Sequence, residues 1–493
     1  MSKYDYDAIV IGGGAAGLTA SGIAANFGAK TMMVERNRLG GDCTWTGCVP
    51  SKILLKAGKV AQQIREAGKY GLIDQDPEIN FKKVIEHLHQ RRQEIYEDAD
   101  RPEIYEEMGV EVVGGKAHFI SEHEIEIIDE GKNKRTVSSR YFFICAGSSP
   151  FIPPIEGIDN VPYLTTESLF EIKDLPQELI ILGAGPIGTE MAQAMSRLGA
   201  KVTVIDIADR ILLKDDAELA GMLQSTLEAE GIRYVLNADV QGVKQEDGKL
   251  MVDVSAGDSH DHIIGDKLLV ATGRRANVDK LGLDEAGIKY SAKGIDINNK
   301  CQTNQSHIYA CGDVTGRYQL THMSEHMAKV ATTNALLKYR MKIDASNVPW
   351  VTYTDPELGH VGATRKQLKN DDTNFETYRF PYSKIDRALT DSEGEGLIKI
   401  YAKKWSGRIL GVDILGARAG ELLSEYALAM KNGLSLRNIA DTIHPYPSYG
   451  LGARRAADQW YIKNQSEWQV KLIKKVFGYH GNVPDFSDPD RIV

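Results

Sequence analysis

Two short hydrophobic runs, each ending in a glycine-rich loop, mark the first half of the chain. Residues 6–11 read as a buried strand, and the run Gly-Gly-Gly-Ala-Ala-Gly that follows opens an alanine-rich helical stretch. Residues 179–182 form a second such run, followed by another glycine-rich loop and a helical pattern. Each predicts a strand–turn–helix unit, and together they are the only internal repeat.

The pattern of the second half differs. After Pro349, residues 396–401 and 409–415 alternate as short strands, and residues 419–432 turn helical. We therefore predict an α/β fold with two Rossmann-like dinucleotide-binding domains and a separate C-terminal α+β domain. Three prolines, Pro150, Pro153 and Pro154, predict a crossing from the first domain to the second.

Composition narrows the class of protein. A length of 493 residues predicts two to four domains, and a net charge of -9 gives no general reason to expect nucleic acid or an anionic membrane as partner. A small-molecule substrate is the better expectation. The start of the chain does not resemble a secretory signal, and no run approaches the roughly 20 apolar residues of a membrane span, which predicts a cytoplasmic protein without stable membrane insertion.

The first glycine loop has the context of a dinucleotide site. Gly12 permits the tight turn, Gly14 lets a pyrophosphate approach the backbone, and Gly17 allows close packing of helix on strand. Glu35 ends the next predicted strand, where a carboxylate can bind a ribose hydroxyl. A glycine-rich loop without a ligand is the alternative.

The second loop repeats this arrangement with Gly183, Gly185 and Gly188. Asp206 ends the following strand and favours NADH over NADPH, because a carboxylate would repel a 2′-phosphate. Arg210 is close enough in sequence to weaken that preference.

Five cysteines are too few for a disulfide framework, and only Cys43 and Cys48 lie close in sequence. Pro50 is tolerated in the first turn of a helix, so Cys48 should lie near the start of a helix, where the dipole favours a thiolate. Two buried free thiols are the alternative on spacing alone. Two dinucleotide sites in one chain favour a redox-active pair.

Residues 40–52, Gly-Gly-Asp-Cys-Thr-Trp-Thr-Gly-Cys-Val-Pro-Ser-Lys, resemble the active-site signature of the class I pyridine nucleotide-disulfide oxidoreductases. The resemblance extends to residues 271–273, 303–313 and 353–357, and covers nearly all of residues 1–460. It implies an FAD-binding domain at 1–150 and 276–346, an NAD(P)-binding domain at 151–275, a dimerisation domain at 347–465, and a tail at 466–493.

The resemblance also implies roles. Cys48 would be the thiol beside the flavin, forming a charge-transfer pair when reduced, and Cys43 the thiol that meets substrate. Lys52 and Glu190 would form an ion pair near the flavin, although both could instead be solvated helix residues. The implied FAD-binding residues are Gly12, Gly14, Gly17, Glu35, Gly41, Lys52, Gly147 and Asp313, and the implied NAD-binding residues are Gly183, Gly185, Gly188, Asp206 and Gly273.

One segment departs from the family. Disulfide reductases of this kind carry a His-Pro with a Glu five residues on, a pair that protonates the leaving thiol. Here Tyr446 takes the histidine position and Leu451 the glutamate position, while His444 lies two residues away without a carboxylate partner in sequence. Tyrosine is a poor base at neutral pH. Packing at the subunit interface is the alternative role of Tyr446 and Tyr449.

A Pro-Tyr at this place is similar to mercuric reductase, whose substrate needs no proton on sulfur. Mercuric reductases usually add a C-terminal cysteine pair and an N-terminal metal-binding module, neither of which this sequence contains. We expect a homodimer in which Tyr446 of the partner subunit completes each site, with Tyr446 or His444 as catalytic candidates, and electrons pass from NADH through FAD and the cysteines to a thiophilic metal. The alternatives are a dihydrolipoamide dehydrogenase-type disulfide reductase, and a flavin oxidase or quinone reductase with a cysteine sensor.

Three further features complete the sequence interpretation. His322 and His326 share a helical face, a spacing that can bind metal, but packing near the flavin is favoured and no metal cofactor is expected. The remaining cysteines are expected to be isolated, inert core residues: Cys145, Cys301 and Cys311. Residues 471–477 form a short basic amphipathic stretch, which predicts a surface helix; a membrane contact is the less favoured alternative.

Overall fold

The structure is a computed structural model that describes residues 3–257 and 259–486. It forms two compact units, each assembled from separate stretches of chain. Unit 1 comprises Met1–Ala61, Pro77–Ile207 and Ala238–Ile343, and unit 2 comprises Gln62–Asp76, Ala208–Asn237 and Asp344–Val493. The predicted domain limits, which follow continuous chain, remain a prediction.

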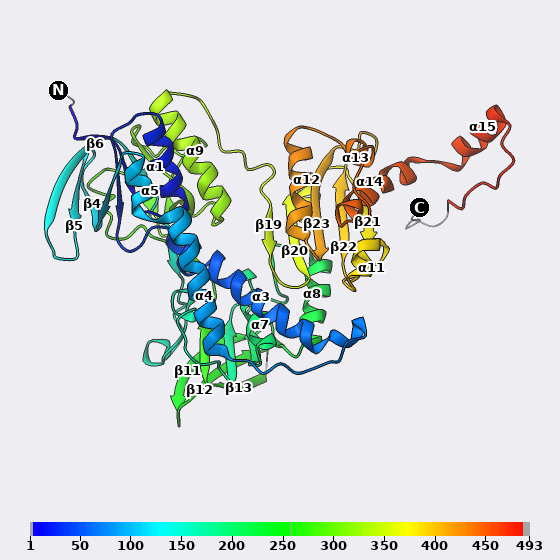
Figure 1. The fold of residues 1–493 in the computed structure, drawn as a ribbon. Helices are drawn as coiled ribbons and strands as arrows, with labels where there is room; N and C mark the ends of the chain where they lie inside the picture. Colours follow the sequence, from blue (N-terminus) through cyan, green and yellow to red (C-terminus); the bar gives the residue numbers. More distant parts are fainter. Residues whose placement is uncertain (1–2, 258, 487–493) are drawn as a thin grey trace. The chain divides into compact units, whose positions relative to one another are not determined.

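A seven-stranded sheet forms the first layer of unit 1 (Figure 1). Its order is β3-β2-β1-β6-β5-β4, with β18 paired to β6, and β1, β2, β3, β6 and β18 run parallel. Ala8 and Val10 of β1 face a core shared with α1 and α9, whereas Ile9 and Ile11 face the opposite core. The strands are β1 (Tyr6–Ile11), β2 (Thr31–Glu35), β3 (Val110–Gly114), β4 (Lys116–Ser121), β5 (Glu124–Ile128), β6 (Lys134–Ile144) and β18 (Ile308–Ala310).

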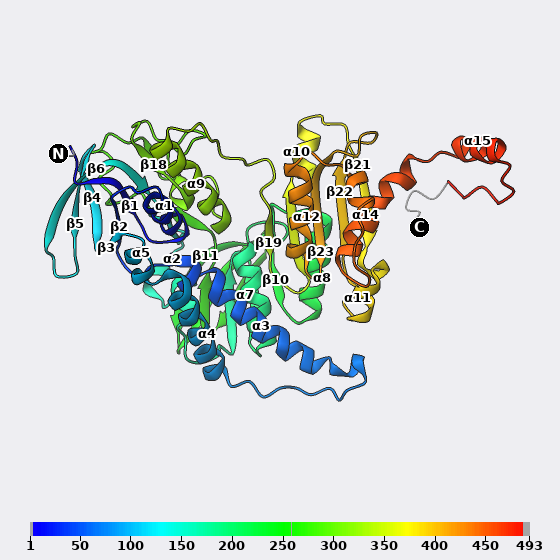
Figure 2. The ribbon, with the colours of Figure 1, turned by 45° about the horizontal axis from the view of Figure 1, so that its top comes forward.

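A second parallel sheet, with order β9-β8-β14, continues unit 1 next to an antiparallel sheet of order β11-β12-β13 (Figure 2). The chain passes from the first sheet to the second at β7 (Ser148–Pro150) and returns at β15 (Arg274–Ala276). These two short strands pair antiparallel with each other. The other strands are β8 (Glu178–Leu182), β9 (Lys201–Ile205), β11 (Asp239–Glu246), β12 (Lys249–Ala256), β13 (Ser259–Gly265), β14 (Lys267–Val270), β16 (Tyr290–Ser291) and β17 (Gly294–Ile295).

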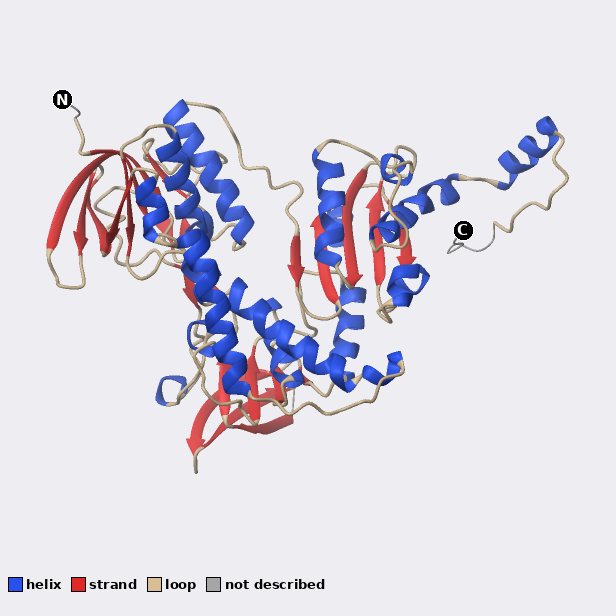
Figure 3. Ribbon diagram, viewed as in Figure 1, coloured by secondary structure: helices blue, strands red, loops and turns tan. Residues whose placement is uncertain are grey.

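Helices connect these strands and cover their faces (Figure 3). Helix α3 spans the limit between the two units, and the π-helix η2 (Tyr96–Asp100) follows α4 directly. The helices of unit 1 are α1 (Ala15–Asn26), α2 (Gly41–Trp45), α3 (Cys48–Arg65), α4 (Phe81–Ile95), α5 (Pro102–Glu107), α6 (Thr166–Leu169), α7 (Pro186–Arg197) and α9 (Thr321–Leu337). The two predicted strand–turn–helix units are thereby confirmed as β1–α1 and β8–α7.

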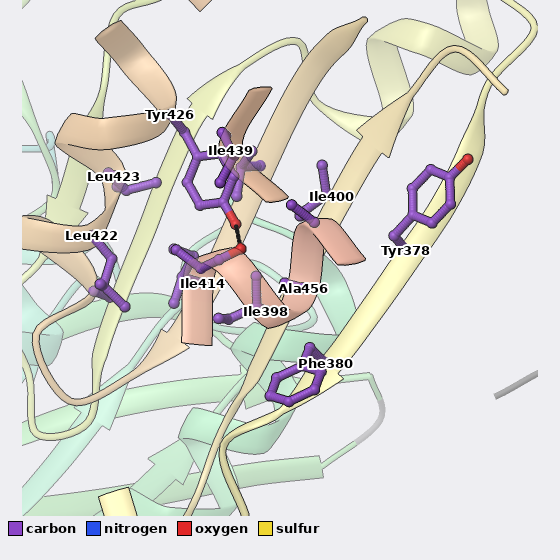
Figure 4. Close-up of a cluster of buried hydrophobic side chains, with 14 of the residues drawn as sticks. Tyr378, Phe380, Ile398, Ile400, Ile414, Leu422, Leu423, Tyr426, Ile439 and Ala456 are labelled. Atoms are coloured by element: carbon purple, nitrogen blue, oxygen red, sulfur yellow. Dashed lines mark hydrogen bonds between the residues drawn. The ribbon is translucent and has the colours of Figure 1, made fainter. Parts of the chain in front are cut away.

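Unit 2 contains a five-stranded antiparallel sheet of order β19-β20-β23-β22-β21, which confirms the predicted α+β domain. Figure 4 shows the apolar face of this sheet, where Ile398, Ile400 and Ile414 pack with Tyr426, whose hydroxyl donates to the Ala453 carbonyl at 3.0 Å. The elements are β10 (Arg233–Val235), β19 (Trp350–Thr352), β20 (Glu357–Gly362), β21 (Glu376–Pro381), β22 (Leu397–Ala402), β23 (Ile409–Gly416), α8 (Ala217–Ala229), α10 (Arg365–Asn370), α11 (Asp386–Thr390), α12 (Ala419–Lys431), α13 (Leu436–Ala440), α14 (Gly450–Asn464) and α15 (Glu467–Phe477).

Successive residues of a strand point to opposite faces of a sheet, so the residues that alternate with these isoleucines lie on the other face. That face buries charged side chains, among them Lys399 and Asp413. The Lys399 ammonium lies 2.7 Å from the Asp216 carboxylate at the start of α8. The Tyr401 hydroxyl donates to Asp413 at 2.6 Å, and the other Asp413 oxygen lies 2.5 Å from the His360 ring. Although burial opposes it, the hydrogen bond to Asp413 raises the pKa of His360.

Within residues 3–257 and 259–486, every helix is too short or too polar to traverse a lipid bilayer.

Candidate functional site

The first glycine loop has the tight geometry that its sequence predicts. Gly12 adopts a φ of +107°, and a Cβ atom there would lie 2.3 Å from the Cys145 carbonyl oxygen. A Cβ on Gly17 would lie 1.8 Å from the Gly12 carbonyl oxygen, so only glycine allows α1 to approach β1 this closely. Glu35 accepts a hydrogen bond from the Gly13 N–H at 2.6 Å, which holds its carboxylate at the loop.

The second loop repeats this geometry. Gly183 adopts a φ of +107°, and a Cβ on Gly188 would lie 1.9 Å from the Gly183 carbonyl oxygen. Asp206 accepts from the Ala184 N–H at 2.5 Å, which matches the contact of Glu35 at the first loop. The two predicted acids therefore occupy equivalent positions.

Both loops fit a dinucleotide. Gly14 and Gly185 are the N-cap residues of α1 and α7, and neither helix has a side-chain cap or an acidic residue in its first turn. Their backbone N–H groups and helix dipoles are thus available to an anionic pyrophosphate. A Cβ on Gly185, Gly147 or Gly273 would meet no protein atom within 4 Å, so these positions leave space beside the backbone. Gly41 packs on the first loop, because its Cβ would lie 2.8 Å from the Gly14 Cα.

The cysteine pair connects two helices of unit 1. Cys43 lies in α2, and Cys48 is the first residue of α3, as Pro50 predicts. Both are free thiols that hydrogen-bond to each other, and the Cys48 sulfur also lies 3.4 Å from the Thr321 hydroxyl at the start of α9. The pair is therefore placed for reversible disulfide formation.

The two thiols differ in acidity. The hydrogen bond from Cys43 lowers the pKa of Cys48 to about 6, with the Thr321 hydroxyl and the Lys52 ammonium acting in the same direction. The same hydrogen bond, together with burial, raises the pKa of Cys43. At neutral pH the reduced pair thus holds its negative charge on Cys48 and its proton on Cys43. Lys52 pairs with the buried Glu190 at 2.8 Å, which is the predicted ion pair.

Asp100 supports the helix that carries Cys43. Its carboxylate accepts from the Thr44 hydroxyl at 2.6 Å, and burial raises its pKa. The negative charge of Asp100 also raises the pKa of Cys43. Asp100 ends the π-helix η2, an irregular element that is frequent at functional sites.

Trp45, between the two cysteines, is held in place by two arginine side chains that pack over its ring. Arg38 and Arg92 lie 4.8 and 5.2 Å from its ring, and its Nε1 donates to the Leu39 carbonyl at 2.7 Å. The buried Arg92 also donates to the Trp45 carbonyl at 2.8 Å. These contacts fix the loop that separates the two thiols.

Asp313 joins a network with Arg274. The Ser148 hydroxyl donates to Asp313 at 2.7 Å, and Arg274 donates to the same hydroxyl at 2.7 Å and to Asp42, next to Cys43. Burial raises the pKa of Asp313 despite the nearby guanidinium. The network connects the crossing strands β7 and β15 to the cysteine loop.

The C-terminal segment of unit 2 adds a contact that the sequence does not show. His444 has no carboxylate partner near it in sequence, but its Nε2 lies 2.9 Å from Glu425 of α12, 19 residues upstream. Its Nδ1 lies 2.9 Å from the Thr442 carbonyl. Tyr446 is 70% exposed, whereas Leu451 is buried and Tyr449 donates to Glu393 at 2.8 Å.

The other candidates divide into two groups. Cys145, Cys301 and Cys311 are buried as expected. Although they are isolated along the sequence, Cys145 and Cys301 both hydrogen-bond with Cys311, whose pKa is raised mainly by burial. His322 and His326 lie on α9. Among the described residues, no group of three or more His, Cys, Asp or Glu side chains could hold a metal ion.

Sequence reasoning did not find several of these residues, and their local sequence carries no signal for them. In unit 1, Asp100, Arg274 and Thr321 reach the cysteine pair and its helices from distant segments. In unit 2, Glu425 reaches His444 from α12.

Comparison with known proteins agrees with this geometry. Residues 6–328 match the pyridine nucleotide-disulphide oxidoreductase family, and residues 348–456 match its dimerisation domain. A mercuric reductase of Lysinibacillus sphaericus is 33% identical over 93% of this chain and 83% of its own length. A dihydrolipoyl dehydrogenase of Buchnera aphidicola is 34% identical over 90% of this chain and 93% of its own.

A solved structure extends the comparison to the fold. The Cu(II) complex of the HOCl-induced flavoprotein disulfide reductase RclA from Escherichia coli has a TM-score of 0.83 at 26% identity, covering 93% of this chain and 100% of that chain. Because these matches span most of the sequence, this chain belongs to the pyridine nucleotide-disulphide oxidoreductase family, as an FAD-dependent flavoprotein disulfide reductase whose dimerisation domain implies a homodimer.

Proposed function

We propose that this enzyme takes an electron pair from NADH and delivers it through Cys48 and Cys43 to a thiophilic metal ion, with mercuric ion as the first candidate. FAD, the cofactor of the family, supplies the two-electron carrier between the nicotinamide and the cysteines. In the net reaction NADH and one mercuric ion give NAD⁺, one proton and metallic mercury. A cupric ion accepts one electron, so two would be consumed for each NADH.

The chain's own residues divide the work. The N–H groups at the starts of α1 and α7 bind the two pyrophosphates, and Glu35 and Asp206 bind the riboses. Lys52, held by Glu190, keeps a positive charge near the Cys48 thiolate. When the Cys48 thiolate and the Cys43 thiol become a disulfide, two electrons go to the metal and the single proton of Cys43 goes to solvent.

Selection of NADH rests on Asp206. Its carboxylate would accept a hydrogen bond from a ribose 2′-hydroxyl and repel a 2′-phosphate. Arg210 could have reversed this preference, but its guanidinium donates to four backbone carbonyls within residues 211–215 at 2.9–3.1 Å. With its donors engaged there, it offers little to a phosphate.

One observation carries the choice of acceptor: the segment that should protonate a leaving thiol has no group suited to do so. Tyr446 has no carboxylate near in sequence, and the buried Leu451 stands at the glutamate position. Both ring nitrogens of His444 face protein oxygens, and its side chain is only 8% exposed. Soft metal ions bind thiolates and need no proton on sulfur, so they suit this site.

The test is an acceptor screen with the FAD-loaded enzyme and NADH, comparing mercuric ion, cupric ion, lipoamide, glutathione disulfide, a quinone and oxygen. We expect the metal ions to be reduced fastest, and Cys43→Ser to abolish that reduction while the matched control Cys145→Ala, at a buried cysteine, preserves it. Acceptor reduction that survives in Cys43→Ser would contradict the dithiol route and support direct flavin chemistry of the oxidase or quinone reductase kind.

Disulfide reduction is the second candidate, and the His444–Glu425 pair is the observation in its favour. Efficient turnover of lipoamide by the unmodified enzyme would establish it and refute the metal assignment. Tyr446→His refines this test, because a restored proton donor from the partner subunit should raise lipoamide turnover, and general acid catalysis is worth about 10²- to 10⁴-fold. The single replacement is preferable to one that adds Leu451→Glu, since a carboxylate there would be buried.

A further inference from the structure

Helix α15 has no role in the chemistry described above. It follows α14 after two residues and lies beyond residues 348–456, which the dimerisation domain matches. None of its side chains is buried, and Trp468, Val476 and Phe477 are each more than 60% exposed. Exposed apolar side chains gathered on one element mark an interaction surface.

The residues of α15 separate by chemistry around the helix axis. At about 100° per residue, Trp468, Leu472 and Val476 lie in one row, and further apolar residues extend it to an arc of about 200°. The complete apolar arc consists of Trp468, Val470, Leu472, Ile473, Val476 and Phe477, interrupted by Gln469. The remaining arc carries three lysines and one glutamate. Lys475 borders the apolar arc beside Trp468, and Lys474 borders its other edge beside Val470.

The helix is stabilised by contacts within its own sequence. Gln469 accepts from the Ser466 N–H at 2.8 Å at the start, and Lys471 pairs with Glu467 at 2.6 Å along the polar face. At the end, Gly478 adopts a left-handed φ of 69°, and the Tyr479 N–H donates to the Lys474 carbonyl at 2.9 Å. Its amphipathic face is thus formed without a neighbouring element.

We propose that α15 docks on an anionic lipid surface, lying in the plane of the bilayer with its apolar arc among the headgroups. A helix that docks in a protein core or groove presents a stripe of little more than about 100°, whereas this arc covers about half the circumference. Tryptophan favours the membrane–water interface, and lysines at both borders can extend their charges to the headgroups.

The charge of the whole chain does not oppose this contact. Its net charge of -9 is spread over 493 residues, and charges more than about 10 Å away are largely screened at 0.1 M salt. The helix itself carries three lysines against one glutamate, which complements anionic headgroups. The contact is peripheral, consistent with the absence of a membrane-spanning helix among the described residues.

Flotation of the full-length, FAD-loaded protein with vesicles tests the proposal. We expect it to float with phosphatidylcholine vesicles that contain phosphatidylglycerol, and much less with phosphatidylcholine alone. Each lysine near an anionic surface contributes about 1 kcal/mol, or roughly fivefold, so Lys474→Gln with Lys475→Gln should weaken binding about 30-fold. The same pair of changes at Lys366 and Lys369, two exposed lysines of α10, is the matched control and should have no effect.

Replacing Trp468 and Leu472 by serine should abolish flotation without changing flavin content or NADH oxidation, because neither side chain is buried. Three results would overturn the proposal. These are failure of the unmodified protein to float on anionic vesicles, flotation of the serine variant equal to that of the unmodified protein, and a serine variant whose dimer dissociates in sedimentation without lipid. The last would assign the apolar arc to a second copy of the chain.

Discussion

Replacement of Cys43 by alanine removes the hydrogen bond that contributes most to the low pKa of Cys48. The variant leaves the other contributors in place, since the Thr321 hydroxyl and the Lys52 ammonium reach Cys48 from α9 and from the next turn of α3. The pKa of Cys48 should therefore rise from about 6 but remain below its ordinary value of 9.0.

The size of this rise follows from the hydrogen bond. A hydrogen bond to a charged group contributes about 1.5–3 kcal/mol, and one pKa unit corresponds to about 1.36 kcal/mol, which gives about 1–2 units. Cys48 is exposed to solvent, which weakens the interaction, so the lower value applies. We expect a pKa of Cys48 near 7 in Cys43→Ala.

The rate of Cys48 alkylation by iodoacetamide as a function of pH measures this pKa, because only the thiolate reacts. Peptide mass spectrometry confines the measurement to Cys48. Cys43→Ser is the matched control, since its hydroxyl keeps a donor beside the Cys48 sulfur and should preserve most of the low pKa. Identical midpoints in the alanine and serine variants would refute the reasoning and assign the low pKa to Lys52, Thr321 and the start of α3.

Three further predictions test other parts of the chain. Gly188→Ala should raise the KM for NADH about 5- to 160-fold with flavin content unchanged, because its Cβ would lie 1.9 Å from a carbonyl oxygen and such overpacking costs about 1–3 kcal/mol. Gly221→Ala, whose Cβ would meet no atom within 4 Å, is the control, and equal KM values in the two variants would contradict the prediction. NADH should have a higher kcat/KM than NADPH, and Asp206→Ala should lower the ratio of the NADH value to the NADPH value about tenfold or more. A higher kcat/KM with NADPH in the unmodified enzyme would contradict the assignment of NADH selectivity to Asp206. Burial raises the pKa of the Asp215 carboxyl to about 6, so the protonated form of Asp215 favours the folded state. This contribution to stability is fully present below the unfolded pKa of 3.8 and is lost as pH rises through 6. Asp215→Asn should therefore unfold at a higher temperature than the unmodified enzyme at about pH 7, with the gain smaller by about 1 kcal/mol at about pH 5, and a gain that grows on acidification would show the sign to be wrong.

The parts of the fold that the sequence predicts are those that depend on local chemistry. Gly12 and Gly183 need a left-handed backbone, and Pro50 sets the first turn of α3, so short motifs predict these turns. Glu35 ends β2 and Asp206 directly follows β9, the strands that come after α1 and α7, which keeps each acid at its loop.

The parts that sequence reasoning missed depend on pairing between distant segments. Thr44 and Asp100 are 56 residues apart, Cys48 and Thr321 are 273 apart, and Asp42 and Arg274 are 232 apart. No spacing or periodicity connects such positions. Alternating apolar and charged residues, as in Ile398, Lys399 and Ile400, likewise predict a strand with one face toward a core and one toward water. Lys399 is nevertheless buried, because a second layer that the sequence does not reveal covers the charged face.

This second layer, helix α8, determines where the dimerisation domain can be cut from the rest of the chain, whether by recombination or by design. The carboxylates of Asp216 and Glu218 that neutralise Lys399 come from a stretch more than 100 residues upstream, between two strands of the preceding dinucleotide unit. A fragment that begins at Asp344 would lack both these partners and helix α8, which packs on this face of the sheet, so side chains that are buried in the whole protein, Lys399 among them, would be exposed to water. Residues 344–493 are consequently not expected to fold correctly when separated from residues 208–237. Recombination or truncation at that boundary should give insoluble protein, whereas a graft that also carries residues 208–237 keeps the charges matched.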